Sequence, residues 1–246
     1  MRLRAVPGCF AGTRRSRGVL VDSEMPVRLM QQRLAALEAA HDTQPKGDYF
    51  RMLSGDATPD GLPDLGTPGR QIELDAAIGD AEVIFLDNLS TLVRSARENE
   101  GDDWVAFQEW QLKQRREHRS VVMIHHAGKA GMQRGTSRRE DVLDTVVSLR
   151  RPDGYSADQG ARFVVELDKA RGVYGDEARP FIARYQEDRD GAAVWTHQKI
   201  EDLVERMAEL TLEGKSVRKI AEETGMSKSA VDRTRQKAVD RGLVTA

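Results

Sequence analysis

The sequence predicts an α/β fold in which a parallel β-sheet is flanked by helices and followed by a small all-α domain. Between residues 18 and 150, short apolar runs alternate with longer segments of helical periodicity, as in strands joined by crossover helices. Some runs are unbroken, as in AEVIFLDNLSTL at residues 81–92, and unbroken runs are typical of strands buried on both faces. From about residue 200 the composition changes to amphipathic helices with a basic end.

The elements follow from apolar spacing and from the turn residues between the runs. The expected strands of the parallel sheet lie at 18–22, 48–53, 83–86, 120–124 and within 141–150, and the helices between them lie at 27–40, 70–79 and 104–118. The aromatic residues of the helix at 104–118 are expected to pack in the core. Three later strands, near 162–168, 180–186 and 192–197, are joined by short turns and are expected to be antiparallel. The segments at 1–17, 54–69 and 94–103 are expected to be loops, the first of them a loop or disordered lead-in.

Composition excludes several classes of protein. Of the 246 residues, 39% are hydrophobic and 32% charged, which describes a charge-rich globular chain. The net charge of −2 means that any surface for binding a polyanion must be local. A single cysteine, Cys9, excludes an internal disulfide. No apolar run is long enough to span a membrane and no secretory signal is evident, so a cytoplasmic location without membrane partners is expected.

Polar residues follow three of the predicted parallel strands. Glu24 comes shortly after the first, Asp87 ends the third, and His125 and His126 follow the next. Because the carboxyl ends of parallel strands share one edge, these side chains are expected to converge where open α/β sheets bind ligands. Each residue alone has a plainer explanation: Asp87 as a helix cap or turn residue, Glu24 as an acid at a helix start, and the histidines as a loop pair. Metal binding by the histidines is a weak alternative, because no third ligand has a suitable spacing.

These segments carry a resemblance to a known family. VLVDSEMP, VIFLDNLSTL, VVMIHHAGKAGMQRGTSRREDVLDTVVSLRR and LDKARG, in that order, resemble the AAA-family, RecA-like ATPases of the RepA hexameric-helicase type, over about residues 18–185. That family occurs on bacterial plasmids and mobile elements. The resemblance implies a RecA-like sheet, ATP and Mg²⁺ as cofactors, and a ring-shaped homo-oligomer around DNA.

The resemblance also implies a role for each matching residue. Asp87 matches the Walker B acid that holds magnesium, and Glu24 matches the glutamate that polarises the attacking water. His126 matches the polar sensor that links nucleotide state to the DNA-facing loop after it. Lys169 and Arg171 match the pair that reaches into a neighbouring subunit's site as an arginine finger.

The two polar residues after the Walker B acid, Asn88 and Ser90, are the expected contacts to the bound cofactor.

The sequence departs from this family at the phosphate-binding loop. No G-x-x-x-x-G-K-[ST] segment is present: Gly214, Lys215 and Ser216 have the right ending, but Glu209 stands where the first glycine belongs. The expectation is a chain that lacks the N-terminal portion of the family, keeps the acid, sensor and finger, and binds ATP poorly. The sheet would then have an unpaired position where the missing strand belongs.

The C-terminal segment predicts a helix-turn-helix. An amphipathic helix at 201–213 precedes SVRKIAEETGMSKSAVDRTRQKAVDRGLV, in which Ala221, Gly225 and Val231 have the spacing of a helix contact, a left-handed turn and an apolar anchor. The second helix, about 227–241, is basic and resembles the DNA-facing helix of resolvase-type and sigma-factor-like modules. The expected DNA contacts are Ser227, Lys228, Ser229, Arg233, Arg235 and Lys237. A protein-contact winged helix or a plain three-helix cap is the alternative.

The predicted organisation is a lead-in at 1–17, a RecA-like ATPase domain at 18–198 without its first strand and phosphate loop, and a helix-turn-helix domain at 199–246. The first hypothesis is a DNA-associated ATPase of helicase type from plasmid or mobile-element replication, impaired in ATP binding. The second is a DNA-binding protein whose degenerate, non-hydrolysing ATPase domain serves assembly. A metal-dependent hydrolase built on Asp87, His125 and His126 is a third.

Overall fold

A computed structural model describes residues 16–40, 47, 49–95, 104–126, 140–152 and 155–245. The chain divides into two compact units, with the division between Leu143 and Asp144. The predicted lead-in therefore lies almost wholly outside the described residues, as does most of the loop at 94–103. The predicted junction at residue 198 falls inside the second unit, where a strand ends at Lys199 and a helix begins at Ile200.

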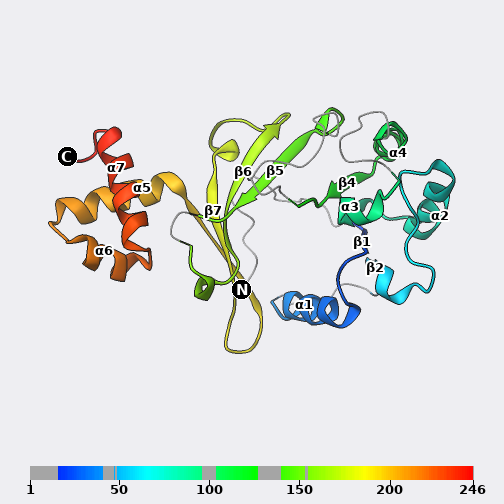
Figure 1. The fold of residues 1–246 in the computed structure, drawn as a ribbon, viewed down its shortest axis with the longest axis horizontal. Coiled ribbons are helices and arrows are strands. Elements are labelled where there is room, and N and C mark those ends of the chain that lie inside the picture. The colour runs from blue at the N-terminus through cyan, green and yellow to red at the C-terminus, as the bar shows by residue number, and fades with distance from the viewer. Residues whose placement is uncertain are drawn as a thin grey trace. The chain divides into compact units, whose positions relative to one another are not determined.

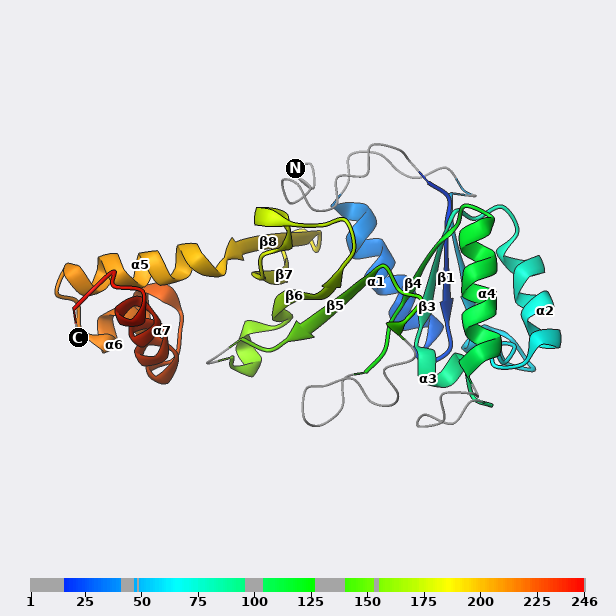
Figure 2. The same cartoon turned by 90° about the horizontal axis from the view of Figure 1, so that it is seen from above.

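The first unit contains a four-stranded parallel sheet in the order β2-β1-β3-β4. Its elements, shown in Figure 1, are β1 (Gly18–Asp22), α1 (Val27–Ala39), β2 (Phe50–Ser54), η1 (Gly55–Ala57), α2 (Pro68–Ile78), β3 (Val83–Asp87), α3 (Leu89–Leu92), α4 (Val105–Arg116) and β4 (Ser120–Met123). Figure 2 shows α2 and α4 on one side of this sheet and α1 on the other. The predicted α/β class with a parallel sheet is thus confirmed.

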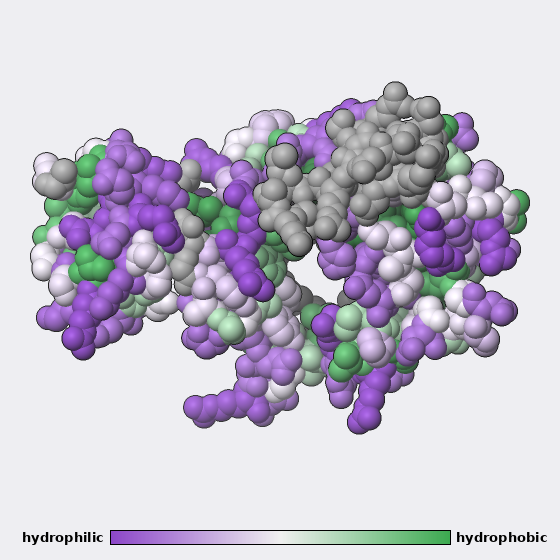
Figure 3. Space-filling model, viewed as in Figure 1, coloured by the Kyte–Doolittle hydropathy of each residue, from purple (hydrophilic) through white to green (hydrophobic). Residues whose placement is uncertain are grey.

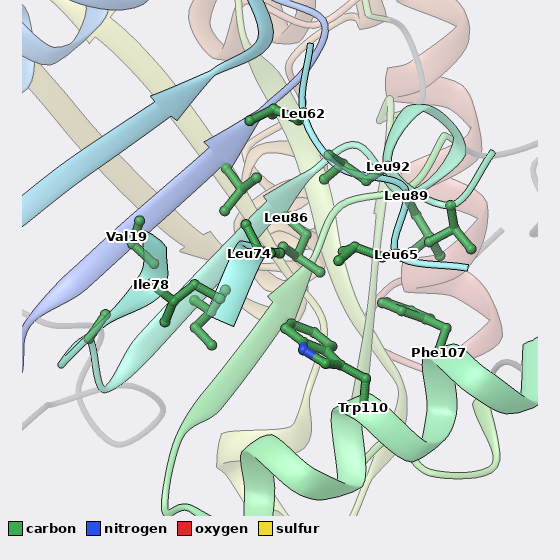
Figure 4. Packing of buried hydrophobic residues seen from close by; sticks show 14 of the residues in the cluster. Val19, Leu62, Leu65, Leu74, Ile78, Leu86, Leu89, Leu92, Phe107 and Trp110 are labelled. Carbon is green, nitrogen blue, oxygen red and sulfur yellow. The ribbon is translucent and has the colours of Figure 1, made fainter. Parts of the chain in front are cut away.

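The main core lies between the sheet and α2 and α4. Alternate residues of β1 and β3 point to this side, where they meet apolar side chains of both helices, as the labelled cluster in Figure 4 shows. Trp104, Phe107 and Trp110 are each 2% exposed, and the Phe107 and Trp110 rings stack with centroids 5.8 Å apart. Packing in the core was the expected role of these aromatic residues, and the structure confirms it.

The opposite face of the sheet is less completely covered. Val122 of β4 and the following Ile124 are 42% and 41% exposed. Within the described part of the chain, β4 is the last strand on its side of the sheet. An edge strand leaves backbone N–H and C=O groups without a ladder partner on its outer side.

The second unit begins with an antiparallel sheet in the order β5-β6-β7-β8. Its elements are β5 (Thr145–Arg150), η4 (Ala157–Gln159), β6 (Arg162–Ala170), η5 (Gly175–Ala178), β7 (Phe181–Glu187) and β8 (Ala193–Lys199).

The prediction that 141–150 ends the parallel sheet is wrong, because β5 pairs antiparallel with β6, with Leu149 opposite Val165. The physical reason is that the short apolar stretch of TVVSLR fits either kind of strand, so that its pairing with β6 decides its sheet.

Three helices, α5 (Ile200–Leu212), α6 (Val217–Thr224) and α7 (Lys228–Asp240), complete the second unit. Ser216 and Ser227 cap α6 and α7 by accepting hydrogen bonds from the backbone N–H groups three residues later. Gly225 ends α6 in the left-handed region, with φ +66°. The buried residues form two clusters, one of Met207, Leu210, Ile220, Met226, Ala230 and Val231 and one of Val204, Ala208, Ala238 and Val244.

On the face shown in Figure 3, hydrophilic side chains predominate over these helices, interrupted by small hydrophobic spots. Within the described ranges, no helix is long and apolar enough to cross a membrane.

Candidate functional site

The ends of β1, β3 and β4 bring the predicted site residues of the first unit together. β1 and β3 are in register, so that Asp22 lies opposite Asp87. Beyond β4, the N–H of Ile124 donates to the carbonyl of Leu86 at 2.9 Å, which holds the following histidines beside β3. Glu24 and His126 are in contact, with 3.3 Å between Nε2 of His126 and Oε2 of Glu24.

Asn88 lies at the centre of this contact. Its Nδ2 donates to Oε2 of Glu24 and lies 3.1 Å from Nε2 of His126. Asn88 is 2% exposed, whereas the side chains of Glu24 and His126 are 46% and 68% exposed. We call Glu24, Asn88 and His126 the polar triad. Its buried amide holds a carboxylate that remains accessible to water and to a ligand.

The sequence around Asn88 explains why its side chain is fixed. Asn88 is the N-cap of the short helix α3, and its Oδ1 accepts a hydrogen bond from the N–H of Thr91 at 3.2 Å. The carboxamide therefore caps the helix through its oxygen and holds Glu24 through its nitrogen. The peptide bond between Asp87 and Asn88 is cis.

Asp22 is a site residue that the sequence analysis missed. It is 1% exposed, and its Oδ1 accepts hydrogen bonds from the N–H groups of Glu24 and Met25 at 3.2 and 2.8 Å. Its Oδ2 is buried and has no hydrogen-bond partner among the described residues. The signal was present in the sequence, because Asp22 ends a buried apolar run just as Asp87 does.

The electrostatics at Asp87 favour a cation. Burial raises the pKa of the Asp87 carboxyl, and the nearby charges of Asp22 and Glu24 raise it further, while His126 and Arg33 act in the opposite direction. The charges of Asp22 and Glu24 thus lie close enough to act on Asp87, and a divalent cation there would relieve this repulsion.

Among the described residues, no three His, Cys, Asp or Glu side chains are grouped so as to hold a metal by themselves. This arrangement fits a Mg²⁺ ion that needs only one or two carboxylates from the protein and takes its other ligands from phosphate and water.

The two predicted cofactor contacts differ in their surroundings. The side chain of Asn88 is engaged in the polar triad and the α3 cap. Ser90 is exposed, and its Oγ lies 3.4 Å from Nδ1 of His125. Because His125 and His126 contact different partners, the described side chains give no support to a metal-dependent hydrolase built on this pair.

Lys169 and Arg171, the predicted finger residues, belong to the second unit. Lys169 is in β6 opposite Val146, and Arg171 follows the strand. The N–H of Arg171 donates to the carbonyl of Asp144 at 2.9 Å, and its guanidinium lies 3.8 Å from the Asp144 carboxylate. The guanidinium side chain is 57% exposed, so it remains accessible to a ligand or partner.

The predicted DNA contacts all lie at or in α7, but they do not share one face. Ser229, Arg233 and Lys237 are exposed and spaced four residues apart, which places them in one row along the helix. Arg235 is partly buried and, with Val244, lines a shallow pocket. Ser227 is the N-cap, and its Oγ lies 3.2 Å from that of Ser229. Lys228 is exposed at the first turn.

The parallel sheet, its flanking helices and the acids at its carboxyl edge define the class of RecA-like, ATPase-type domains. Residues 4–132, a little more than half of the chain, match the family model described as AAA domain, and the chain belongs to this family. None of the curated proteins matches the sequence.

Among solved structures, the chain is similar to the flagellar accessory protein FlaH from Methanocaldococcus jannaschii. The TM-score is 0.50 and the sequence identity 11%, over 74% of this chain and 77% of FlaH. At this identity the likeness supports the RecA-like fold alone.

Proposed function

We propose that this protein is a DNA-associated, RecA-like ATPase of the RepA hexameric-helicase type, acting in replication of a plasmid or mobile element in the cytoplasm. As the sequence stands, its affinity for ATP is weakened. The observation that carries the proposal is the polar triad of Glu24, Asn88 and His126 beside Asp87, at the carboxyl edge of a parallel sheet. This is where open α/β sheets bind ligands.

Each residue at this edge has a task in phosphoryl transfer. Asp87 would hold Mg²⁺, which when bound supplies positive charge for phosphoryl transfer. Glu24 accepts a proton from the attacking water, and its exposed carboxylate leaves room for that water. Asn88 and His126 fix the direction of the Glu24 carboxylate through its Oε2. His126 also precedes the glycine-rich segment at 127–139, which makes it suited to sense the nucleotide.

The weakened affinity for ATP follows from the phosphate-binding loop motif, which the sequence does not contain. Its nearest match is part of a turn between α5 and α6. Gly214 has φ +72°, Lys215 pairs with Glu213 and Glu223 at 3.0 and 2.6 Å, and Ser216 caps α6. A lysine engaged with two carboxylates and a serine engaged as a cap do not form a phosphate cradle.

The DNA-binding element is a helix-turn-helix formed by α6 and α7. The left-handed Gly225 makes the turn, and the row of Ser229, Arg233 and Lys237 faces solvent, as a helix in the major groove requires. Lys169 and Arg171 then act in a neighbouring subunit's site, so that hydrolysis depends on assembly of a ring.

The catalytic assignment is tested by ATP turnover of the full chain at millimolar Mg²⁺ and ATP with single-stranded DNA present. We expect slow turnover that does not saturate easily and that falls at least tenfold in Asp87→Ala and Glu24→Gln. Glu38→Gln, at an exposed position in the last turn of α1, removes an acid outside the site and is the control. Turnover that survives Asp87→Ala would contradict the assignment.

A complete lack of turnover, combined with DNA binding, would favour the alternative. In that case the protein is a DNA-binding protein whose degenerate domain serves assembly. The observation in its favour is that the sequence does not contain the phosphate-binding motif.

DNA binding is tested with the full chain and a labelled duplex. Arg233→Ala with Lys237→Ala should weaken binding at least tenfold and flatten its dependence on salt, because each lost phosphate contact reduces the salt slope by about one. Arg70→Ala with Arg116→Ala, two exposed arginines of the first unit, is the charge-matched control. Equal binding by both double variants would show that α7 does not read DNA.

A further inference from the structure

The antiparallel sheet of the second unit places two arginines directly opposite each other. Arg162 of β6 and Arg184 of β7 are register partners. Opposed residues of an antiparallel pair have Cβ atoms about 4.5–5.5 Å apart, and like charges at this distance are destabilising. Without a counter-ion, this pair costs stability.

The protein itself compensates this charge only in part. Nη1 of Arg162 donates to Oε1 of Gln159 at 3.0 Å, a neutral acceptor. Nε of Arg184 is buried and has no hydrogen-bond partner among the described residues. Burial lowers the pKa of Arg162, and the charge of Arg184 lowers it further. The carboxylate of Asp158 lies near enough to interact with Arg184 but is exposed to solvent.

Two more arginines line a pocket beside Arg162. A pocket of about 290 Å³ is lined by Arg150, Arg151 and Arg162 together with Tyr155. The guanidinium of Arg151 lies over the Tyr155 ring, 4.8 Å from its centroid. Arg150 is paired with Glu166. Three guanidinium groups, those of Arg150, Arg151 and Arg162, thus border this pocket, and Arg184 lies opposite Arg162 on the neighbouring strand.

We propose that Arg162 and Arg184, with Arg150 and Arg151 at the rim, bind a phosphate group. A tetrahedral anion offers several acceptor oxygens, which suits guanidinium forks and would satisfy the buried Nε of Arg184. The source is either a phosphodiester of a nucleic acid or a free phosphate. The segment that holds Arg162 also contacts the turn between α6 and α7, because Nε2 of Gln159 donates to the carbonyl of Gly225 at 3.1 Å. A backbone phosphate of DNA lying on α7 is therefore the favoured source.

Binding of phosphate by these arginines does not require that α7 binds DNA, because inorganic phosphate can be tested in the absence of DNA. We would measure thermal unfolding of the full chain in chloride and in inorganic phosphate at equal ionic strength. Phosphate should raise the melting temperature of the wild type by about 2–4 °C, as expected for an anion that binds only the folded state. Arg184→Gln and Arg162→Gln should lose this rise. Arg189→Gln, an exposed arginine in the β7–β8 turn, removes the same charge and should keep it.

A second readout separates binding from a structural role. In chloride, Arg184→Gln should melt at or above the wild-type temperature, because it removes a like-charge contact. A structural role for Arg184 predicts a lower melting temperature instead. If Arg184→Gln fails to fold, Arg162→Gln carries the test.

The source of the phosphate is decided by anisotropy of a labelled duplex. If the dissociation constant for the duplex is at least threefold higher for Arg184→Gln than for Arg189→Gln, the site binds nucleic acid. If the two dissociation constants are equal while phosphate still raises the melting temperature of the wild type and not of Arg184→Gln, the site binds free phosphate. The proposal is overturned if phosphate stabilises Arg184→Gln, Arg162→Gln and Arg189→Gln alike.

Discussion

Replacing Asn88 tests whether the polar triad is built as described. In Asn88→Ala the α3 cap is lost, which costs about 1 kcal/mol of the free energy of unfolding. The hydrogen bond to Glu24 is lost as well. A hydrogen bond to a charged group contributes about 1.5–3 kcal/mol. Because the half-exposed Glu24 carboxylate can bond to water in the variant, we expect the loss of this bond to cost only about 1 kcal/mol. The expected total is about 2 kcal/mol.

Tryptophan fluorescence can report on the first unit alone. Trp104 and Trp110 are buried in the unit that contains Asn88, whereas the third tryptophan, Trp195, belongs to the second unit. In a Trp195→Phe background, urea unfolding followed by fluorescence gives the free energy of unfolding of the first unit.

Asn88→Asp is the informative partner variant. It keeps a good cap but places a carboxylate beside Glu24 and Asp87. Its folded-state pKa is raised by these neighbours, so the variant should be destabilised at pH 7 and should recover as the pH falls and the new carboxyl is protonated. Ser90→Ala should stay within about 0.5 kcal/mol of wild type. The reasoning fails if Asn88→Ala matches Ser90→Ala, or if the loss in Asn88→Asp does not depend on pH.

Three further predictions concern other parts of the chain. The pKa of Asp87 is raised above 3.8 in the folded protein, so that between the unfolded-state and folded-state pKa values the folded state holds more protons than the unfolded state. The free energy of unfolding should therefore fall as the pH rises from the unfolded-state pKa to the folded-state pKa. Asp87→Asn should remove this fall and stabilise the first unit at pH 7 in the same fluorescence assay, and a destabilised variant would contradict it. Met207→Ala, at a fully buried position, should cost about 2–5 kcal/mol in amide exchange of α5–α7, whereas the 71% exposed Leu212→Ala should cost little; equal costs would refute the packing. Gly225→Ala should cost about 1 kcal/mol in the same exchange measurement because φ is +66°, and an unchanged exchange rate would show that the turn has a different conformation.

Much of the site could be predicted from the sequence because strand ends carry local signals. Glu24, Asp87 and His126 each follow an apolar run, and the common direction of parallel strands brings them together. The aromatic residues at 104–110 were predicted as core on different grounds, because large apolar side chains are usually buried. Asp22 ends an apolar run as Asp87 does, but its place directly opposite Asp87 depends on the register between β1 and β3.

Other features depended on pairing between distant residues. β5 was placed in the wrong sheet because its short apolar stretch fits either kind of strand, and only its partner, β6, decides. The opposition of Arg162 and Arg184 follows from the register of β6 and β7, 22 positions apart in the chain. The separation of Arg235 from the row of Arg233 and Lys237 follows from helix geometry and could have been read from the sequence.

The central claim is that a RecA-like site and a DNA-binding helix act in one protein. The most direct test is the ATP turnover of the full chain as DNA concentration is raised. We predict turnover that increases with DNA, that loses this increase in Arg233→Ala with Lys237→Ala, and that disappears in Asp87→Ala. Turnover that does not change with DNA, or that persists in Asp87→Ala, would contradict the account.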